Sequence, residues 1–129
     1  MRILIVEDER PTAEDIRLLV KEILGNRIES IHIETTLDGA WCYLQDRPID
    51  LLLLDLNLNA KDGFTLLKQI AARPFHTIVI SANTNRAIEA FEYGVLDFIP
   101  KPYTVSRLSA AFERLNASHA LDGHAIKYL

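Results

Sequence analysis

The sequence predicts one α/β domain of the flavodoxin-like (βα)5 class, a doubly wound sandwich with a parallel sheet in the order 2-1-3-4-5. Five apolar runs of strand length alternate with segments in which apolar residues recur at helical spacing. Such alternation is typical of a parallel sheet with helices on both faces, joined by right-handed crossovers. The 129 residues are enough for one hydrophobic core.

The elements follow one another along the chain with clear boundaries. The first helix has an apolar face, begins after Pro11, which stands at a first-turn position, and stops at Gly25. The fourth helix is short and weakly apolar and ends at Gly94, so we expect it to be the least firmly held. Strands are predicted over residues 2–6, 28–35, 50–55, 77–80 and 97–100, and helices over 12–24, 37–45, 64–72, 85–93 and 104–117.

Composition excludes several classes of protein. Eighteen acidic and fourteen basic residues give a net charge of -4, so we expect no direct contact between this domain and nucleic acid. No apolar run approaches the about 20 residues of a membrane helix, and no signal peptide precedes the first strand. We expect a soluble, cytoplasmic protein without membrane contact. The single cysteine, Cys42, lies in an apolar helical stretch, which predicts a buried thiol.

Polar side chains follow four of the five predicted strands. Glu7 and Asp8 follow the first, Asp55 the third, Ser81 the fourth and Lys101 the fifth. Because the carboxyl ends of parallel strands line the crevice in which such folds bind ligands, these side chains are expected in one pocket. Three clustered carboxylates repel each other by roughly 4 kcal/mol per close pair, which favours strong pKa shifts or a bound cation. Oxygen ligands without histidine or cysteine favour Mg²⁺, with Mn²⁺ as the alternative ion.

Five motifs together resemble the receiver domain of bacterial two-component response regulators. Their order is specific, because an acidic pair, an aspartate, a serine and a Lys-Pro each follow a different predicted strand. The stretch 90–98 is most similar to receivers attached to LytTR-type DNA-binding domains. The motifs are Ile5-Val6-Glu7-Asp8-Glu9, Leu53-Leu54-Asp55-Leu56-Asn57, Asp62-Gly63, Ile80-Ser81-Ala82 and Asp97-Phe98-Ile99-Pro100-Lys101-Pro102.

The resemblance implies a phosphoacceptor site with a metal ion. Asp55 would accept a phosphoryl group from the phosphohistidine of a sensor histidine kinase. Lys101 and Ser81 would each contact a phosphoryl oxygen, and Lys101-Pro102 resembles the family's cis-peptide turn. The Mg²⁺ site would comprise Asp55, Asp8 as a direct ligand, Glu7 through a water molecule and Asn57 through its backbone carbonyl. Glu7 stands where aspartate is commoner in the family.

The resemblance also implies a switch and a tuned lifetime of the phosphorylated state. Ser81 and Phe98 would be the switch residues, acting on the face formed by the fourth helix, fifth strand and fifth helix, although Phe98 equally suits plain core packing. That face would also serve a homodimer. The residues expected to tune dephosphorylation are Asn57, Ala82 and Asn83, with Ala82 leaving room for an attacking water.

The loop after Asp55 departs from the family pattern. Asn59 stands where proline is frequent, so we expect a more mobile loop. Asp62-Gly63 predicts a turn into the third helix, with Gly63 supplying backbone freedom.

We therefore predict a receiver domain over residues 1–117 and a tail over 118–129 that links it to an output domain outside this chain. The domain would be a signalling phosphoacceptor rather than an enzyme, controlling transcription. An FMN carrier would need a phosphate-binding loop where Glu7 and Asp8 stand. A haloacid-dehalogenase-type phosphatase places its nucleophile after the first strand, not the third. A degenerate receiver that acts as a constitutive protein-interaction module is the remaining alternative.

Overall fold

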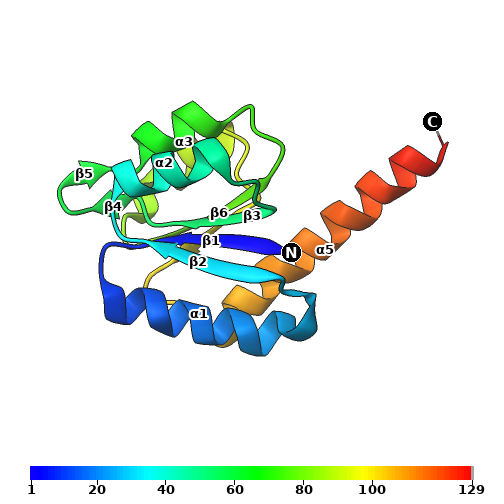
Figure 1. Cartoon of the computed structure of the whole chain (residues 1–129), viewed down its shortest axis with the longest axis horizontal. Helices are drawn as coiled ribbons and strands as arrows, with labels where there is room; N and C mark the ends of the chain where they lie inside the picture. Colours follow the sequence, from blue (N-terminus) through cyan, green and yellow to red (C-terminus); the bar gives the residue numbers. More distant parts are fainter. Residues whose placement is uncertain (129) are drawn as a thin grey trace.

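The computed structural model describes the backbone of residues 1–128 and the side chains of residues 1–116. A five-stranded sheet runs through its centre in the order β2-β1-β3-β6-β7, and every neighbouring pair is parallel (Figure 1). Because β6 and β7 are the fourth and fifth strands of this sheet, the predicted order is confirmed. The strands are β1 (Arg2–Val6), β2 (Ser30–Glu34), β3 (Leu51–Leu54), β6 (His76–Ser81) and β7 (Asp97–Pro100).

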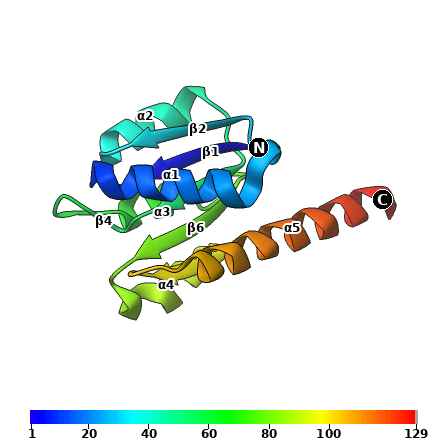
Figure 2. The ribbon, with the colours of Figure 1, turned by 90° about the horizontal axis from the view of Figure 1, so that it is seen from below.

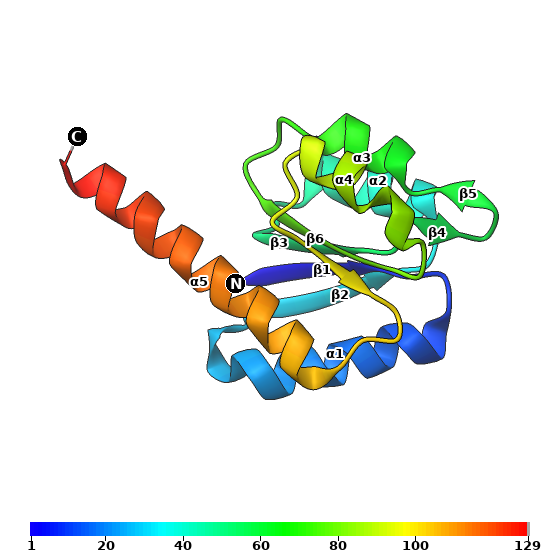
Figure 3. The same cartoon turned by 180° about the vertical axis from the view of Figure 1, so that it is seen from behind.

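Helices cover both faces of the sheet, which is the predicted sandwich. Figures 1 and 3 show α1 and α5 on one face and α2, α3 and α4 on the other. The helices are α1 (Arg10–Leu24), α2 (Leu37–Asp46), α3 (Phe64–Ile70), α4 (Ala87–Glu92) and α5 (Val105–Tyr128), with the 3-10 turns η1 (Gly25–Arg27) and η2 (Thr84–Arg86). A small antiparallel hairpin of β4 (Asn57–Leu58) and β5 (Lys61–Asp62) follows β3 and precedes α3 along the chain.

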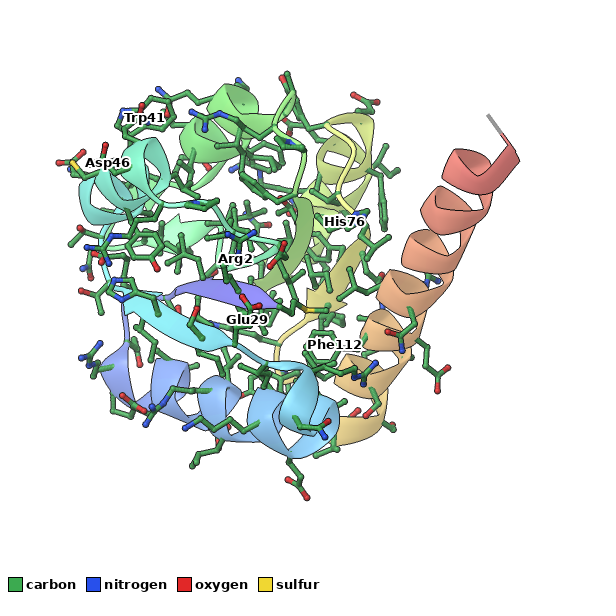
Figure 4. The ribbon with its side chains drawn as sticks, turned by 45° about the vertical axis from the view of Figure 1, so that its right-hand side comes forward. Arg2, Glu29, Trp41, Asp46, His76 and Phe112 are labelled. Atoms are coloured by element: carbon green, nitrogen blue, oxygen red, sulfur yellow. The ribbon has the colours of Figure 1, made fainter. Side chains whose placement is uncertain are left out.

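The two faces of the sheet have separate hydrophobic clusters, because neighbouring residues of a strand point to opposite sides. Leu4 and Val6 of β1 belong to the cluster under α2, α3 and α4, whereas Ile3 and Ile5 belong to the one under α1 and α5. Phe112 of α5 is 1% exposed and lies against the sheet (Figure 4). The central strand β3 is apolar throughout because both of its faces are covered.

The predicted helix ends agree with the structure in α1 and α4. Pro11 is in the first turn of α1, and Gly25 ends the helix with a φ of 56° and an N–H that donates to the Lys21 carbonyl. Helix α4 has only six residues, and Gly94 follows it with a φ of 83°.

Two expectations about the helices were wrong. Helix α5 continues to Tyr128 instead of ending near residue 117 (Figure 2), since no proline after residue 117 interrupts its backbone hydrogen bonds. Cys42 is exposed. The buried residues of α2 are Ala40 and Leu44, and a residue two positions from each lies on the opposite side of a helix. The role of residues 118–129 as a linker stays a prediction; their side chains and Leu129 lie outside the described residues.

Candidate functional site

The predicted site residues gather at the carboxyl ends of the strands. Glu7 directly follows β1, Asp55 follows β3, Ser81 is the last residue of β6 and Lys101 follows β7. Glu7 is 1% exposed, Asp55 6% and Ser81 0%. Since these strands lie side by side in the sheet, Glu7, Asp55 and Lys101 line one pocket although they are far apart in sequence.

Lys101 links two of the carboxylates. Its ammonium Nζ donates to Glu7 Oε1 at 2.7 Å and to Asp55 Oδ2 at 2.9 Å. The backbone N–H of Lys101 donates to the Ser81 carbonyl at 3.0 Å, which fixes the lysine to the neighbouring strand. The Lys101–Pro102 peptide bond is cis, as the resemblance implied.

The three acidic residues form one cluster. Glu7, Asp8 and Asp55 each offer a carboxylate oxygen, and these oxygens lie within 4.8 Å of one another. Asp55 Oδ1 accepts the Asn57 N–H at 3.0 Å, and Asp8 Oδ2 accepts the Asn59 N–H at 3.2 Å. Glu7 Oε2 is buried and has no hydrogen-bond partner among the described residues. Hard carboxylate oxygens, one of them buried and unpaired, fit a divalent cation such as Mg²⁺.

Glu7 and Lys101 both have raised pKa values, for different reasons. Burial, and then the neighbouring Asp55 carboxylate, raise the pKa of Glu7 from 4.5 to about 8, although Lys101 opposes the shift. Burial alone would lower the pKa of Lys101, but its contacts with Glu7 and Asp55 outweigh burial and raise it. Without a cation, these shifts favour a protonated Glu7 and a charged Lys101.

Ser81 and Phe98 are both buried in this structure. Ser81 Oγ accepts the Asn83 N–H at 3.1 Å, which shapes the loop that leaves β6. Phe98 is 6% exposed and packs in the same cluster as Ala90 and Val95. Burial of Phe98 fits both core packing and a switch residue in its inward position, so the switch role stays a prediction.

The hairpin after Asp55 was not foreseen in the sequence. Asn59 and Ala60 form its turn with φ angles of 48° and 64°, in the left-handed region. Asparagine tolerates this conformation, whereas proline, with φ fixed near -65°, cannot adopt it. The position therefore excludes the family's proline in this backbone. The expected mobility of the loop stays a prediction.

The explanation offered for Gly63 was wrong. Its φ of -60° and ψ of -16° are ordinary helical values, so no special backbone freedom is used. A Cβ at this position would lie 2.8 Å from both the Asp55 carbonyl oxygen and the Leu56 Cα. Glycine is needed because the start of α3 approaches the backbone of the candidate phosphoacceptor.

A buried ion pair beside Phe98 was also missed. Asp97 is 1% exposed, and Arg107 donates to both of its oxygens at 2.7 Å and to the Phe98 carbonyl at 3.1 Å. Asp97 Oδ1 in turn accepts the Phe98 N–H at 2.8 Å. The sequence does place a carboxylate, Asp97, at the start of an apolar strand. A carboxylate that becomes buried there needs a partner of opposite charge.

The residues expected to tune dephosphorylation are accessible. Asn57, Ala82 and Asn83 are all exposed, and Asn57 and Asn83 line the same polar surface pocket, together with Lys61 and Arg86. Arg86 donates to Asp62 Oδ1 at 2.8 Å, which connects η2 to the hairpin.

In the part of the chain that the structure describes, no helix is both long and apolar enough to cross a membrane.

A parallel (βα)5 sandwich with an acidic pocket and an inward lysine at its carboxyl edge defines a class of signalling domain. The sequence model of the response regulator receiver domain family matches residues 3–113. The chain belongs to this family, which consists of signalling domains of two-component systems.

Curated relatives support the same assignment. The transcriptional regulatory protein YpdB of Escherichia coli (strain K12) is 34% identical over 123 residues, covering 92% of this chain and 48% of the relative. The sensory transduction protein LytR of Staphylococcus haemolyticus is 33% identical over 119 residues, covering 89% of this chain and 45% of the relative. The chain thus spans about half the length of the curated relatives it matches.

Solved structures agree with the fold. The response regulatory domain of protein mrkE from Klebsiella pneumoniae has a TM-score of 0.83 and 28% identity, covering 92% of this chain and 97% of that chain. NtrX from Brucella abortus has a TM-score of 0.78 and 30% identity, covering 99% of this chain and 29% of that chain.

Proposed function

We propose that this domain accepts a phosphoryl group on Asp55 from a sensor histidine kinase and uses it to switch an output. The observation that carries the proposal is the Asp55 carboxylate at the carboxyl edge of the sheet, 2.9 Å from Lys101 and clustered with Glu7 and Asp8. A nucleophile, a fixed cation and two further carboxylates are the groups that phosphoryl transfer to an aspartate requires.

Each residue of the site has its own role in the proposed phosphoryl transfer. An Asp55 oxygen forms the new P–O bond as the P–N bond of the phosphohistidine breaks and the imidazole leaves. Lys101 moves from the carboxylate to a phosphoryl oxygen, and the Ser81 hydroxyl, whose oxygen accepts the Asn83 N–H, donates its proton to another. The cation would be held directly by Asp8, Asp55 and the carbonyl of Asn57, and by Glu7 through a water molecule. When bound, Mg²⁺ or Mn²⁺ supplies positive charge that offsets the negative charge of donor and acceptor.

Chemical phosphorylation tests the proposal. Acetyl phosphate or phosphoramidate with Mg²⁺ should label the domain, and Asp55→Asn or a chelator should abolish the label. Asp38→Asn is the matched control, because that aspartate has a side chain 88% exposed and lies outside the acidic cluster, so it should label normally. Stoichiometric labelling of Asp55→Asn, or labelling that ignores the chelator, would refute the assignment. A wild-type domain that takes no label would favour the alternative, a constitutive protein-interaction module.

The switch would run from Ser81 through Phe98 to the face formed by α4, β7 and α5. As the phosphoryl group draws Ser81 towards it, Phe98 fills the space that opens, and α4, which has only six residues, shifts. Phosphorylation changes the populations of two accessible states by its different interaction with each.

Exposed apolar side chains support a homodimer through this face. Ile88 and Phe91 of α4 are 78% and 45% exposed, and Val105 at the start of α5 is 49% exposed. Burying them against a second copy would remove apolar surface from water.

In our proposal, the output domain that the receiver controls lies outside this chain. Residues 118–129 would link the receiver to a DNA-binding domain of the LytTR type that controls transcription, and the length of the relatives, about twice that of the chain, supports this. With a net charge of -4, the receiver itself would leave DNA contact to that domain. We place the whole protein in the cytoplasm.

A further inference from the structure

Arg86 joins the two loops that border the polar pocket beside Asp55. Its guanidinium Nη1 donates to Asp62 Oδ1 in the β4–β5 hairpin at 2.8 Å, and its backbone N–H donates to the carbonyl of Asn83, in the loop after β6, at 3.3 Å. We propose that Arg86 is a positioning residue, which holds the two loops at a fixed separation and thereby sets how fast the acyl phosphate on Asp55 is hydrolysed. The inference rests on the proposed function and adds a residue that the family resemblance does not name.

Asp62 connects Arg86 to the strand position opposite Asn57. In the antiparallel pairing of β4 with β5, Asp62 lies directly across from Asn57. The Asp62 Oδ1 that accepts from Arg86 also accepts the Phe64 N–H at 3.0 Å, at the start of α3. The ion pair therefore fixes the hairpin at the residue that faces Asn57, while the backbone of the same arginine fixes the loop that carries Asn83.

The guanidinium of Arg86 is itself held in place. Its Cζ lies 3.9 Å from the centroid of the Phe64 ring, and Phe64 is 1% exposed. A guanidinium over an aromatic face is attracted by the ring electrons. Glu89 of α4 approaches the same guanidinium at 3.7 Å, and the Arg86 side chain is only 26% exposed. An arginine with its planar group restrained in this way can fix the position of Asp62, as a freely moving surface side chain could not.

The pocket is open to water while Arg86 is in place. Its volume is about 230 Å³, which is room for several waters at about 30 Å³ each, and Asn57 and Asn83 are exposed. Arg86 therefore does not act by excluding water. It supplies the relative position of the Asn57 and Asn83 amides, which can donate and accept hydrogen bonds with a water molecule in the pocket. The pocket is lined by Leu56, Asn57, Ala60, Lys61, Asp62, Asn83 and Arg86.

Hydrolysis of the acyl phosphate requires an oriented water molecule. The water oxygen bonds to phosphorus while the P–O bond to Asp55 breaks, and the electron pair of that bond stays on the carboxylate. One proton of the water remains on the released phosphate and the other passes to solvent. A water held between the Asn57 and Asn83 amides is oriented before it attacks. Without Arg86 the two loops would move independently, so hydrolysis should slow.

The lifetime of the acyl phosphate tests the inference. The whole chain is labelled with acetyl phosphate and Mg²⁺, the donor is removed and the loss of label is followed. Arg86→Gln should slow hydrolysis by about three-fold or more, and Asp62→Asn, which keeps an oxygen for the Phe64 N–H but loses the charge, should slow it by a similar factor. The double variant should match each single variant, because both changes remove the same ion pair.

Glu89→Gln is the matched control. Glu89 contacts the same guanidinium but lies in α4 rather than in the hairpin, so its loss should leave the lifetime at the wild-type value. The level of label under excess donor provides a second measurement. Slower hydrolysis raises this level, whereas a general loosening of the site would slow labelling as well and would not raise it.

The possible outcomes separate this inference from the proposed function. An unchanged or shorter lifetime in Arg86→Gln, or a double variant that shows the product of the two single effects, would overturn the role of Arg86 and leave the phosphoacceptor proposal standing. A level of label that falls in Arg86→Gln would also overturn it. A wild-type domain that takes no label would overturn both. Asp62→Asn decides the question if Arg86→Gln fails to fold.

Discussion

The Asp97–Arg107 ion pair gives a sharp prediction about the fifth strand of the sheet. Arg107 neutralises a carboxylate whose side chain is only 2% exposed and also donates to the Phe98 carbonyl. Burial alone would raise the pKa of Asp97, but Arg107, the Phe98 N–H and Arg114 outweigh burial and lower it. Replacing Arg107 with glutamine should leave a buried charge whose remaining partners are weak.

The expected cost follows from this geometry. Removing one partner of a buried pair costs about 3–5 kcal/mol. Arg107 has a side chain 34% exposed, and water would partly replace it, so we expect Arg107→Gln to lower the free energy of unfolding by about 2–3 kcal/mol. For a domain of this size, that loss corresponds to a fall in Tm of roughly 10 °C.

Urea and thermal unfolding followed by circular dichroism measure the effect. Arg114→Gln is the matched control, since Arg114 approaches the same carboxylate at 3.7 Å and has a side chain 59% exposed. An exposed pair of this kind contributes about 0–1 kcal/mol, so the control should be almost neutral. A loss below about 1 kcal/mol in Arg107→Gln, or equal losses in the two variants, would refute the assignment of Arg107 as the stabilising partner.

Four further predictions concern the site and its switch. The acyl phosphate should be short-lived and its lifetime should change on substitution of Asn57 or Asn83; a label stable for days would contradict this. Beryllofluoride with Mg²⁺ should shift amide resonances over residues 84–115, and shifts confined to the Asp55 pocket would reject the switch. Gly63→Ala should cost about 1–3 kcal/mol and slow labelling, because its Cβ would meet backbone atoms at 2.8 Å; an unchanged Tm and labelling rate would argue against this. Without divalent ions, the stabilising contribution of protonated Glu7 should be full below pH 4.5 and disappear as pH rises through about 8, and Mg²⁺ should counteract the loss; urea melts that show no such trend would exclude it.

The sequence predicted the fold because the information that it needs is local. Apolar runs, helical spacing and the positions of Pro11 and Gly25 are read from neighbouring residues, and they identify five strands and their helices. Once the sheet is parallel, the carboxyl ends of its strands lie together, so Asp55 and Lys101 could be assigned to one pocket from their positions alone.

Side-chain surroundings could not be predicted in the same way. Lys101 and Glu7 are 94 residues apart, and only the folded sheet brings Nζ within 2.7 Å of Oε1 and buries the other oxygen. Gly63 is required by the nearby backbone of Asp55, and Arg107 is placed by the packing of α5 beside β7. Local pattern determined which residues end each strand, whereas distance, burial and charge at the site depend on contacts between segments far apart in the chain. Those contacts form only when the sheet and its covering helices assemble.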